Sequence, residues 1–210
     1  MNTIVIALRA TAVTLVLTGL LYPLGMTGAA QVLFPGSANG SLVKDQTGKV
    51  IGSRLIGQPF SNPGYFQGRP SAAGGGYDGT SSSGSNFGPT SAKLRDRVKA
   101  DVDRLLKENP SASGLIPAEL VMASGSGLDP HLSPEGARWQ VPRVAKARNV
   151  APERIAATLE ELVEGRDLGF FGEPTVNVLL LNVALDQKFG KPAAAVKEPT
   201  PTQAVAAPPQ

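Results

Sequence analysis

Residues 10–43 contain no charged side chain, and this uncharged run constrains the fold more than any other feature of the sequence. Its first part, Ala10 to Leu24, is rich in Val, Leu, Thr and Ala, and Ile4 to Leu8 extend the apolar stretch beyond Arg9. A helix needs about 20 apolar residues to cross a bilayer. The sequence therefore predicts a single transmembrane helix over residues 5–28.

The charge that flanks this segment predicts its orientation. Arg9 lies near the N-terminal end, where its long side chain can reach the lipid headgroups. Together with the α-amino group it makes the N-terminal flank the positive one, so we expect the N-terminus in the cytoplasm and residues 31–189 outside it. A cleaved signal peptide, cut near Thr27–Ala30, is the alternative, and it also places the domain outside the cytoplasm.

Composition limits the soluble part to a loop-rich fold. Gly and Pro, 24 and 18 residues, make up a fifth of the 210-residue chain, and aromatic residues only 5%. The absence of cysteine excludes disulfides, thiol nucleophiles and Cys-ligated zinc. The net charge is +3 and the basic residues are scattered, whereas nucleic-acid binding needs a concentrated basic patch, so we expect no nucleic-acid partner.

The periodicity of the remaining chain predicts an α+β domain with a small sheet and several short helices. Lys49 to Ile56 has the alternation of a strand, and residues 31–40 read as an extended exit from the membrane. Proline, hydroxyl and acidic residues mark helix starts, and Val141-Pro142 is expected to interrupt one helix. The expected helices are 90–107, 133–141, 152–164 and 174–189. Residues 190–210 form a Pro/Ala-rich tail without expected structure.

Few residues are candidates for chemistry. Asp129, His131 and Glu135 lie within seven residues, but they provide only two close ligands and the chain has no second histidine, so a loop or capping role for His131 is favoured over a metal site. Residues 74–79 match GxGxxG without the strand and helix that a dinucleotide site needs. Gly125-Ser126-Gly127 can form an anion nest. No catalytic residue is predicted.

Several motifs stand in a fixed order along the chain, and with the membrane segment they span residues from about 5 to 189. They are Gly52–Phe60, Tyr65–Ala72, Ser83–Pro89, Ala123–His131, Gln140–Arg148, Gly165-Arg166 and Gly172–Leu179. In this order they resemble one known family, the C subunit of the Kdp high-affinity potassium-transporting P-type ATPase.

The resemblance implies an accessory, non-catalytic subunit of an ATP-driven potassium uptake complex in the bacterial inner membrane. Its expected partners are a channel-like potassium-binding subunit, a P-type ATPase subunit, a small membrane subunit and the lipid bilayer. The family's C subunit is described as a catalytic chaperone that raises the affinity of the ATPase subunit for ATP. Met122 and Leu162–Glu164 depart from the family pattern, where a threonine and a histidine are expected.

A family glutamine proposed to meet the nucleotide falls on Gln140, so Gln140, Arg143 and Lys146 are the candidate ATP contacts. The predicted orientation conflicts with that role, because it places these residues outside the cytoplasm. The competing hypothesis is that the domain supports the external mouth of the potassium-binding subunit and holds the complex together. An exported, membrane-anchored enzyme or solute-binding module unrelated to transport is the remaining alternative.

Overall fold

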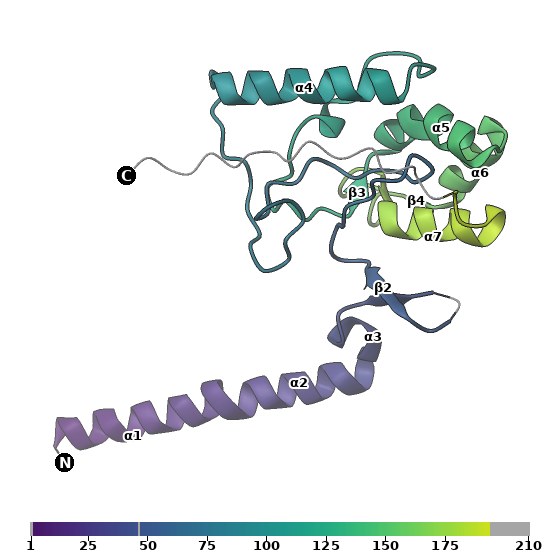
Figure 1. The fold of residues 1–210 in the computed structure, drawn as a ribbon. Helices are drawn as coiled ribbons and strands as arrows, with labels where there is room; N and C mark the ends of the chain where they lie inside the picture. Colours follow the sequence, from purple (N-terminus) through teal and green to yellow (C-terminus); the bar gives the residue numbers. More distant parts are fainter. Residues whose placement is uncertain (1, 46, 194–210) are drawn as a thin grey trace. The chain divides into compact units, whose positions relative to one another are not determined.

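The computed structural model describes residues 2–45 and 47–193, and the chain divides into two units (Figure 1). The first extends to Ile56 and the second begins at Gly57. The predicted boundary at residue 31 stays a prediction, as does the predicted tail, most of which lies outside the described residues.

The first unit is dominated by one helical run over Thr3–Leu33, 31 residues long, which contains the predicted membrane segment. It comprises α1 (Thr3–Val16), the π-helical η1 (Leu17–Leu21) and α2 (Tyr22–Leu33). Its apolar side chains are exposed. Within the part of the chain that the structure describes, it is the one helix long and apolar enough to cross a membrane.

A short hairpin follows this helix. The predicted extended exit is wrong, because α2 continues to Leu33 and a single helical turn, α3 (Pro35–Ala38), comes next. The predicted strand is confirmed in part as β2 (Val50–Ser53). It pairs antiparallel with β1 (Leu42–Lys44), a strand too short to give a sequence pattern.

The second unit contains a small sheet and helices, which confirms the α+β class. The sheet has the order β3-β5-β4, all antiparallel, with β3 at His131–Leu132, β4 at Val163–Glu164 and β5 at Thr175–Asn177. The helices around it are α5 (Pro134–Arg148), α6 (Pro152–Glu161) and α7 (Val178–Phe189). Inward side chains of the sheet and the helices form one apolar core, including Leu132, Val144, Ile155, Leu159, Val176, Leu181 and Leu185.

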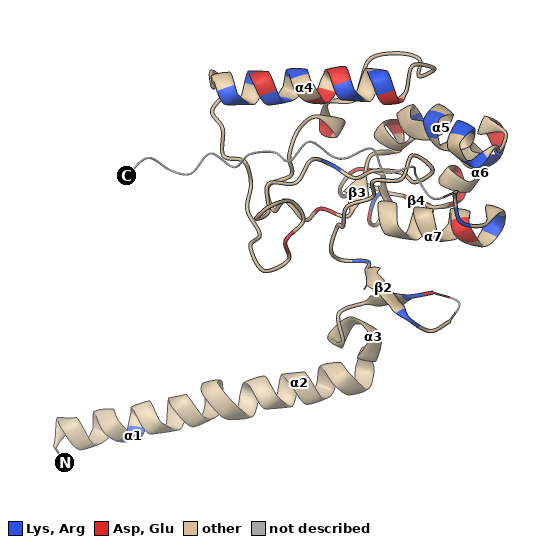
Figure 2. Cartoon of the chain, in the orientation of Figure 1, with Lys and Arg blue, Asp and Glu red and all other residues tan. Residues whose placement is uncertain are grey.

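Helix α4 (Ala92–Glu108) is amphipathic, as its apolar spacing predicts. Acidic and basic residues alternate along it, which Figure 2 shows as interleaved red and blue. Its N-cap is Ser91, whose hydroxyl accepts a hydrogen bond from the Leu94 N–H, one residue beyond the predicted Thr90. A turn of 3₁₀ helix, η2 (Ala118–Leu120), adds Leu120 to the core.

Three predicted helix boundaries are wrong for physical reasons. Helix α5 passes through Pro142 without a break. Proline costs about 3 kcal/mol inside a helix, but Val141, Val144 and Ala145 on the same helix are buried in the core and offset that cost.

The other errors concern the sheet. Residues 175–177 form β5, and Asn177 then caps α7 by accepting from the Leu180 N–H. Helix α6 ends at Glu161, so that Val163 and Glu164 can pair with β5. These strands form because they pair with segments far away in the sequence, and the local pattern of apolar residues carries no information about such pairing.

Candidate functional site

The motif Tyr65–Ala72 and the motif that begins at Gln140 meet in the core of the second unit. Residues 62–69 form no regular strand, yet Phe66 is completely buried. A buried backbone must satisfy its N–H and C=O groups. Side chains from α5 and α7 do this here.

Two side-chain amides clamp consecutive residues of this segment. Gln140 Oε1 accepts from the Gln67 N–H at 2.9 Å, and its Nε2 donates to the Gln67 carbonyl at 2.9 Å. Asn182 on α7 makes the same pair with Phe66, at 2.8 and 2.9 Å. Each side-chain amide therefore makes the two backbone hydrogen bonds that a neighbouring strand would make in a sheet.

Arg143 and Arg148 extend the clamp along the same segment. Arg143 Nη1 donates to the carbonyls of Pro63 and Tyr65 at 2.7 and 3.1 Å, and its Nη2 donates to Gln140 Oε1 at 2.7 Å. Burial lowers the pKa of Arg143 to about 10, so the guanidinium stays protonated at neutral pH. Both Nη groups of Arg143 are therefore engaged within the domain.

Arg148 joins three parts of the fold. Its side chain is 2% exposed, and it donates to the Gly64 carbonyl at 2.6 Å and to Asp186 at 2.9 Å. The guanidinium also lies 5.1 Å from the centre of the Tyr65 ring, and the Tyr65 hydroxyl donates to Asp186 at 2.8 Å. Burial, and then the hydrogen bond to Asp186, raise the pKa of Tyr65 to about 12.

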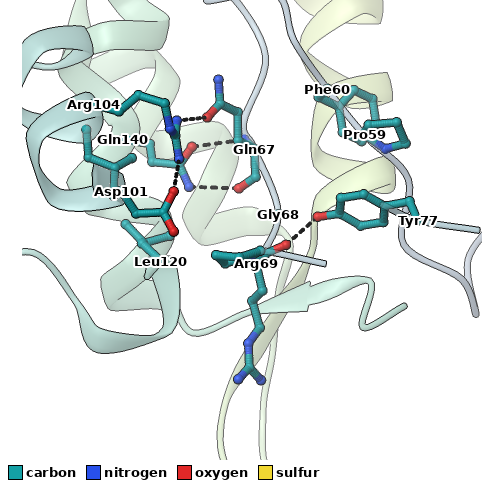
Figure 3. A pocket seen from close by; sticks show the side chains of 12 residues that line it. Pro59, Phe60, Gln67, Gly68, Arg69, Tyr77, Asp101, Arg104, Leu120 and Gln140 are labelled. Carbon is teal, nitrogen blue, oxygen red and sulfur yellow. Dashed lines mark hydrogen bonds and ion pairs between the residues drawn. The ribbon is translucent and has the colours of Figure 1, made fainter. Parts of the chain in front are cut away.

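A pocket of about 210 Å³ opens beside this clamp (Figure 3). Arg104 and Asp101 lie on one side and Phe60 and Tyr77 on the other, with Gln67 between them and Arg69 below Gln67 in this view. The charged groups are already paired: Arg104 with Asp101 at 3.4 Å and with Glu108 at 3.2 Å, and Arg69 with Asp129 at 3.1 Å. The charged side chains at this pocket are thus neutralised by ion pairs within the protein.

The predicted nucleotide contacts do not share one open site. Gln140 is 2% and Arg143 7% exposed, and both are engaged with the backbone of residues 63–67. Lys146 is exposed and lines a second pocket of about 330 Å³, together with Arg143 and Glu108. The structure joins Gln140 to Arg143 by a hydrogen bond, and Arg143 and Lys146 line the second pocket, which Gln140 does not reach.

Asp129, His131 and Glu135, the residues considered for a metal site, lie in or next to a loop. Asp129 accepts from the His131 N–H at 3.0 Å, His131 Nδ1 lies 3.7 Å from Asp129, and Glu135 points to solvent. No cluster of three metal-ligating His, Asp or Glu side chains exists among the described residues.

The Gly125–Gly127 turn is held by hydrogen bonds from the loop of residues 71–83. Gly127 N–H donates to the Ser124 carbonyl, and the Gly127 carbonyl accepts from Ser71 Oγ at 2.5 Å. Ser82 Oγ donates to the Ser126 carbonyl at 2.9 Å. The two loops therefore hold each other in place.

Gln67 and Arg148 lie within the family-like motifs but were not predicted as site residues, and Asn182 and Asp186 were not singled out either. A signal for two clamp residues was present: Gln140 and Asn182 each stand between apolar residues on helices, at Trp139-Gln140-Val141 and Leu181-Asn182-Val183. Polar groups in such positions are buried and therefore hydrogen-bonded. Their partner, the backbone of residues 66–67, is not encoded in any local pattern.

A family model and individual relatives all match the chain to the same family. The family model for KdpC, described as K⁺-transporting ATPase, c chain, matches residues 4–187. The potassium-transporting ATPase KdpC subunit of Myxococcus xanthus is 64% identical over 189 residues, 90% of each chain. The KdpC subunits of Caulobacter vibrioides (strain NA1000 / CB15N) and Methylobacterium nodulans are 54% and 55% identical, over 87% and 83% of this chain and 91% and 92% of their own.

Proposed function

The chain belongs to the KdpC family of K⁺-transporting ATPase subunits, and from this premise we propose that it acts without an active site of its own, by assembling and stabilising the potassium uptake complex. One observation carries the proposal. The polar side chains of the family-like motifs, led by Gln140 and Arg143, are used to hold residues 63–67 in the core. These contacts support a structural role for the two side chains, because their polar groups are engaged within the domain.

The proposed topology follows from the first unit. Thr3–Leu33 anchors the chain in the inner membrane, with Arg9 and the N-terminus in the cytoplasm. The second unit then lies outside, where it meets the potassium-binding subunit of the complex. The partner subunits are the channel-like subunit, the P-type ATPase subunit and the small membrane subunit implied by the family resemblance.

An effect of this subunit on ATP affinity, the catalytic chaperone role, is proposed to be indirect. A direct contact would require Gln140 to give up both hydrogen bonds to Gln67. Lys146, the exposed member of the three candidates, is the position at which a direct contact with ATP is best tested. Stabilising the assembled complex raises ATP affinity without any contact, because binding is linked to the conformation that binds.

Reconstitution tests the proposal. The ATPase is purified with and without this chain, and potassium-stimulated ATP hydrolysis and subunit recovery are measured. We expect loss of the chain to reduce both, Lys146→Ala to leave the KM for ATP unchanged, and the isolated chain to hydrolyse no ATP. Hydrolysis by the isolated chain, or a complex that assembles and works fully without it, would refute the accessory role.

A further inference from the structure

The loop between β4 and β5 presents an exposed apolar tip. Leu168, Phe170 and Phe171 are 83%, 65% and 58% exposed, and the two phenyl rings lie 4.2 Å apart, centre to centre. Every residue from 164 to 173 is exposed. Single exposed apolar residues are common, but three within four positions form a patch that needs an explanation.

The tip is held in a fixed conformation. Asp167 and Phe171 exchange two backbone hydrogen bonds of 2.9 Å, and the Gly169 N–H donates to the Arg166 carbonyl at 3.1 Å. Leu168 has φ of 52°, a left-handed conformation that a leucine rarely adopts. The backbone of the loop thus presents these side chains to solvent in a strained conformation, and such strain is found at functional sites.

The base of the loop is rigid too. Strand β5 pairs with β3 on one side and β4 on the other, and Val176 at its centre is completely buried. Arg166 and Glu173 close the loop with an ion pair of 2.6 Å. A preorganised loop loses little conformational entropy on binding, so its apolar surface contributes more fully to affinity.

The net charge of the loop indicates what kind of surface it can bind. Residues 164–173 carry three acidic side chains and one basic, a net charge of −2. Anionic lipids attract Lys and Arg and repel negative charge, so the charge of this loop opposes docking on an anionic lipid surface. A second copy of this chain, meeting tip to tip, would bring two negative loops together.

We propose that the Leu168–Phe171 tip docks into an apolar pocket, edged by Lys or Arg side chains, on another subunit of the ATPase. This inference rests on the proposed function, since it supplies the assembly contact for that role. The tip is too small to form a stable interface alone. Its side chains act as anchors at the centre of a larger interface.

Photo-crosslinking in the whole complex tests the contact. A benzophenone amino acid replaces Phe170 in one chain and Leu115 in a control chain, since Leu115 is 93% exposed in a different loop. We expect ultraviolet light to join another ATPase subunit to position 170 and not to position 115. A crosslink to lipid, to a second copy or to no protein overturns the proposal.

A double variant measures the contribution of the tip. Phe170→Ser with Phe171→Ser keeps the backbone hydrogen bonds of the loop and removes the rings, while Leu115→Ser is the matched control. We expect about tenfold less of the double variant to co-purify with the other subunits, with Leu115→Ser unchanged. Circular dichroism verifies that each variant is folded.

Two failures are distinguishable. If the unaltered chain does not co-purify with the ATPase subunits, the proposed function fails, and this inference with it. If the unaltered chain co-purifies and the double variant does so equally well, the accessory role stands and the docking tip is refuted.

Discussion

Replacing Gln140 with leucine should destabilise the second unit strongly, although the two side chains have similar volumes. The change removes both hydrogen bonds to the Gln67 backbone and the acceptor for Arg143 Nη2. Three polar groups lose their partner, at about 1–3 kcal/mol each. The added apolar burial of leucine returns about 1–2 kcal/mol. We expect a net loss of about 4 kcal/mol in the free energy of unfolding.

Urea unfolding of the full chain in detergent measures this loss. Trp139 is the only tryptophan in the sequence and is 7% exposed, so its fluorescence reports on the core beside Gln140. With a slope of about 2 kcal/mol per molar urea, the midpoint should fall by about 2 M. Because the buffer contains no ATP, the shift reports on the fold alone.

Gln187→Leu is the matched control, since Gln187 lies on the exposed side of α7. It should change the unfolding free energy by less than about 0.5 kcal/mol. A Gln140→Leu chain that unfolds at the midpoint of the unaltered chain would refute the reasoning. Gln140 would then be free for another role, including a contact with nucleotide.

Two further predictions concern the loops and alkaline pH. Gly127 has φ of 70°, and a Cβ there would lie 2.6 Å from backbone atoms of two neighbouring segments, so Gly127→Ala should cost about 3 kcal/mol by urea unfolding. Gly125→Ala, with open space around it, should cost less than about 0.5 kcal/mol. Burial raises the pKa values of Tyr65 and Tyr77 to about 12 in the folded state, above the ordinary 10. The folded state then holds more protons between these values, so stability should fall as pH rises from 10 to 12, and less steeply in a Tyr65→Phe chain; an unchanged slope would contradict it.

The sequence predicted those parts of the fold that local chemistry determines. The uncharged run, the alternating charges of α4 and the Ser133-Pro134-Glu135 helix start each carry their own physical signal, and the elements appear there. The fold class followed from these elements.

The features that depend on distant partners were not predictable. The strand at residues 175–177 exists because β3 and β4 lie on either side of it, and α5 continues through Pro142 because its neighbours are buried. The candidate site shows the same division. Gln140 and Arg143 were identified from a motif, but their contacts with residues 63–67 are 73 to 80 positions away and emerge only in three dimensions.

The side of the membrane on which the second unit lies tests the central claim most directly. The cysteine-free chain allows single cysteines, Leu115→Cys in the second unit and Asn2→Cys at the start of the anchor. Intact cells are treated with an impermeant maleimide, and lysed, denatured samples show that each cysteine can react. The account predicts that the Leu115→Cys chain is labelled in intact cells and the Asn2→Cys chain only after lysis. The reverse pattern would place Gln140, Arg143 and Lys146 beside cytoplasmic ATP and contradict the proposed indirect role.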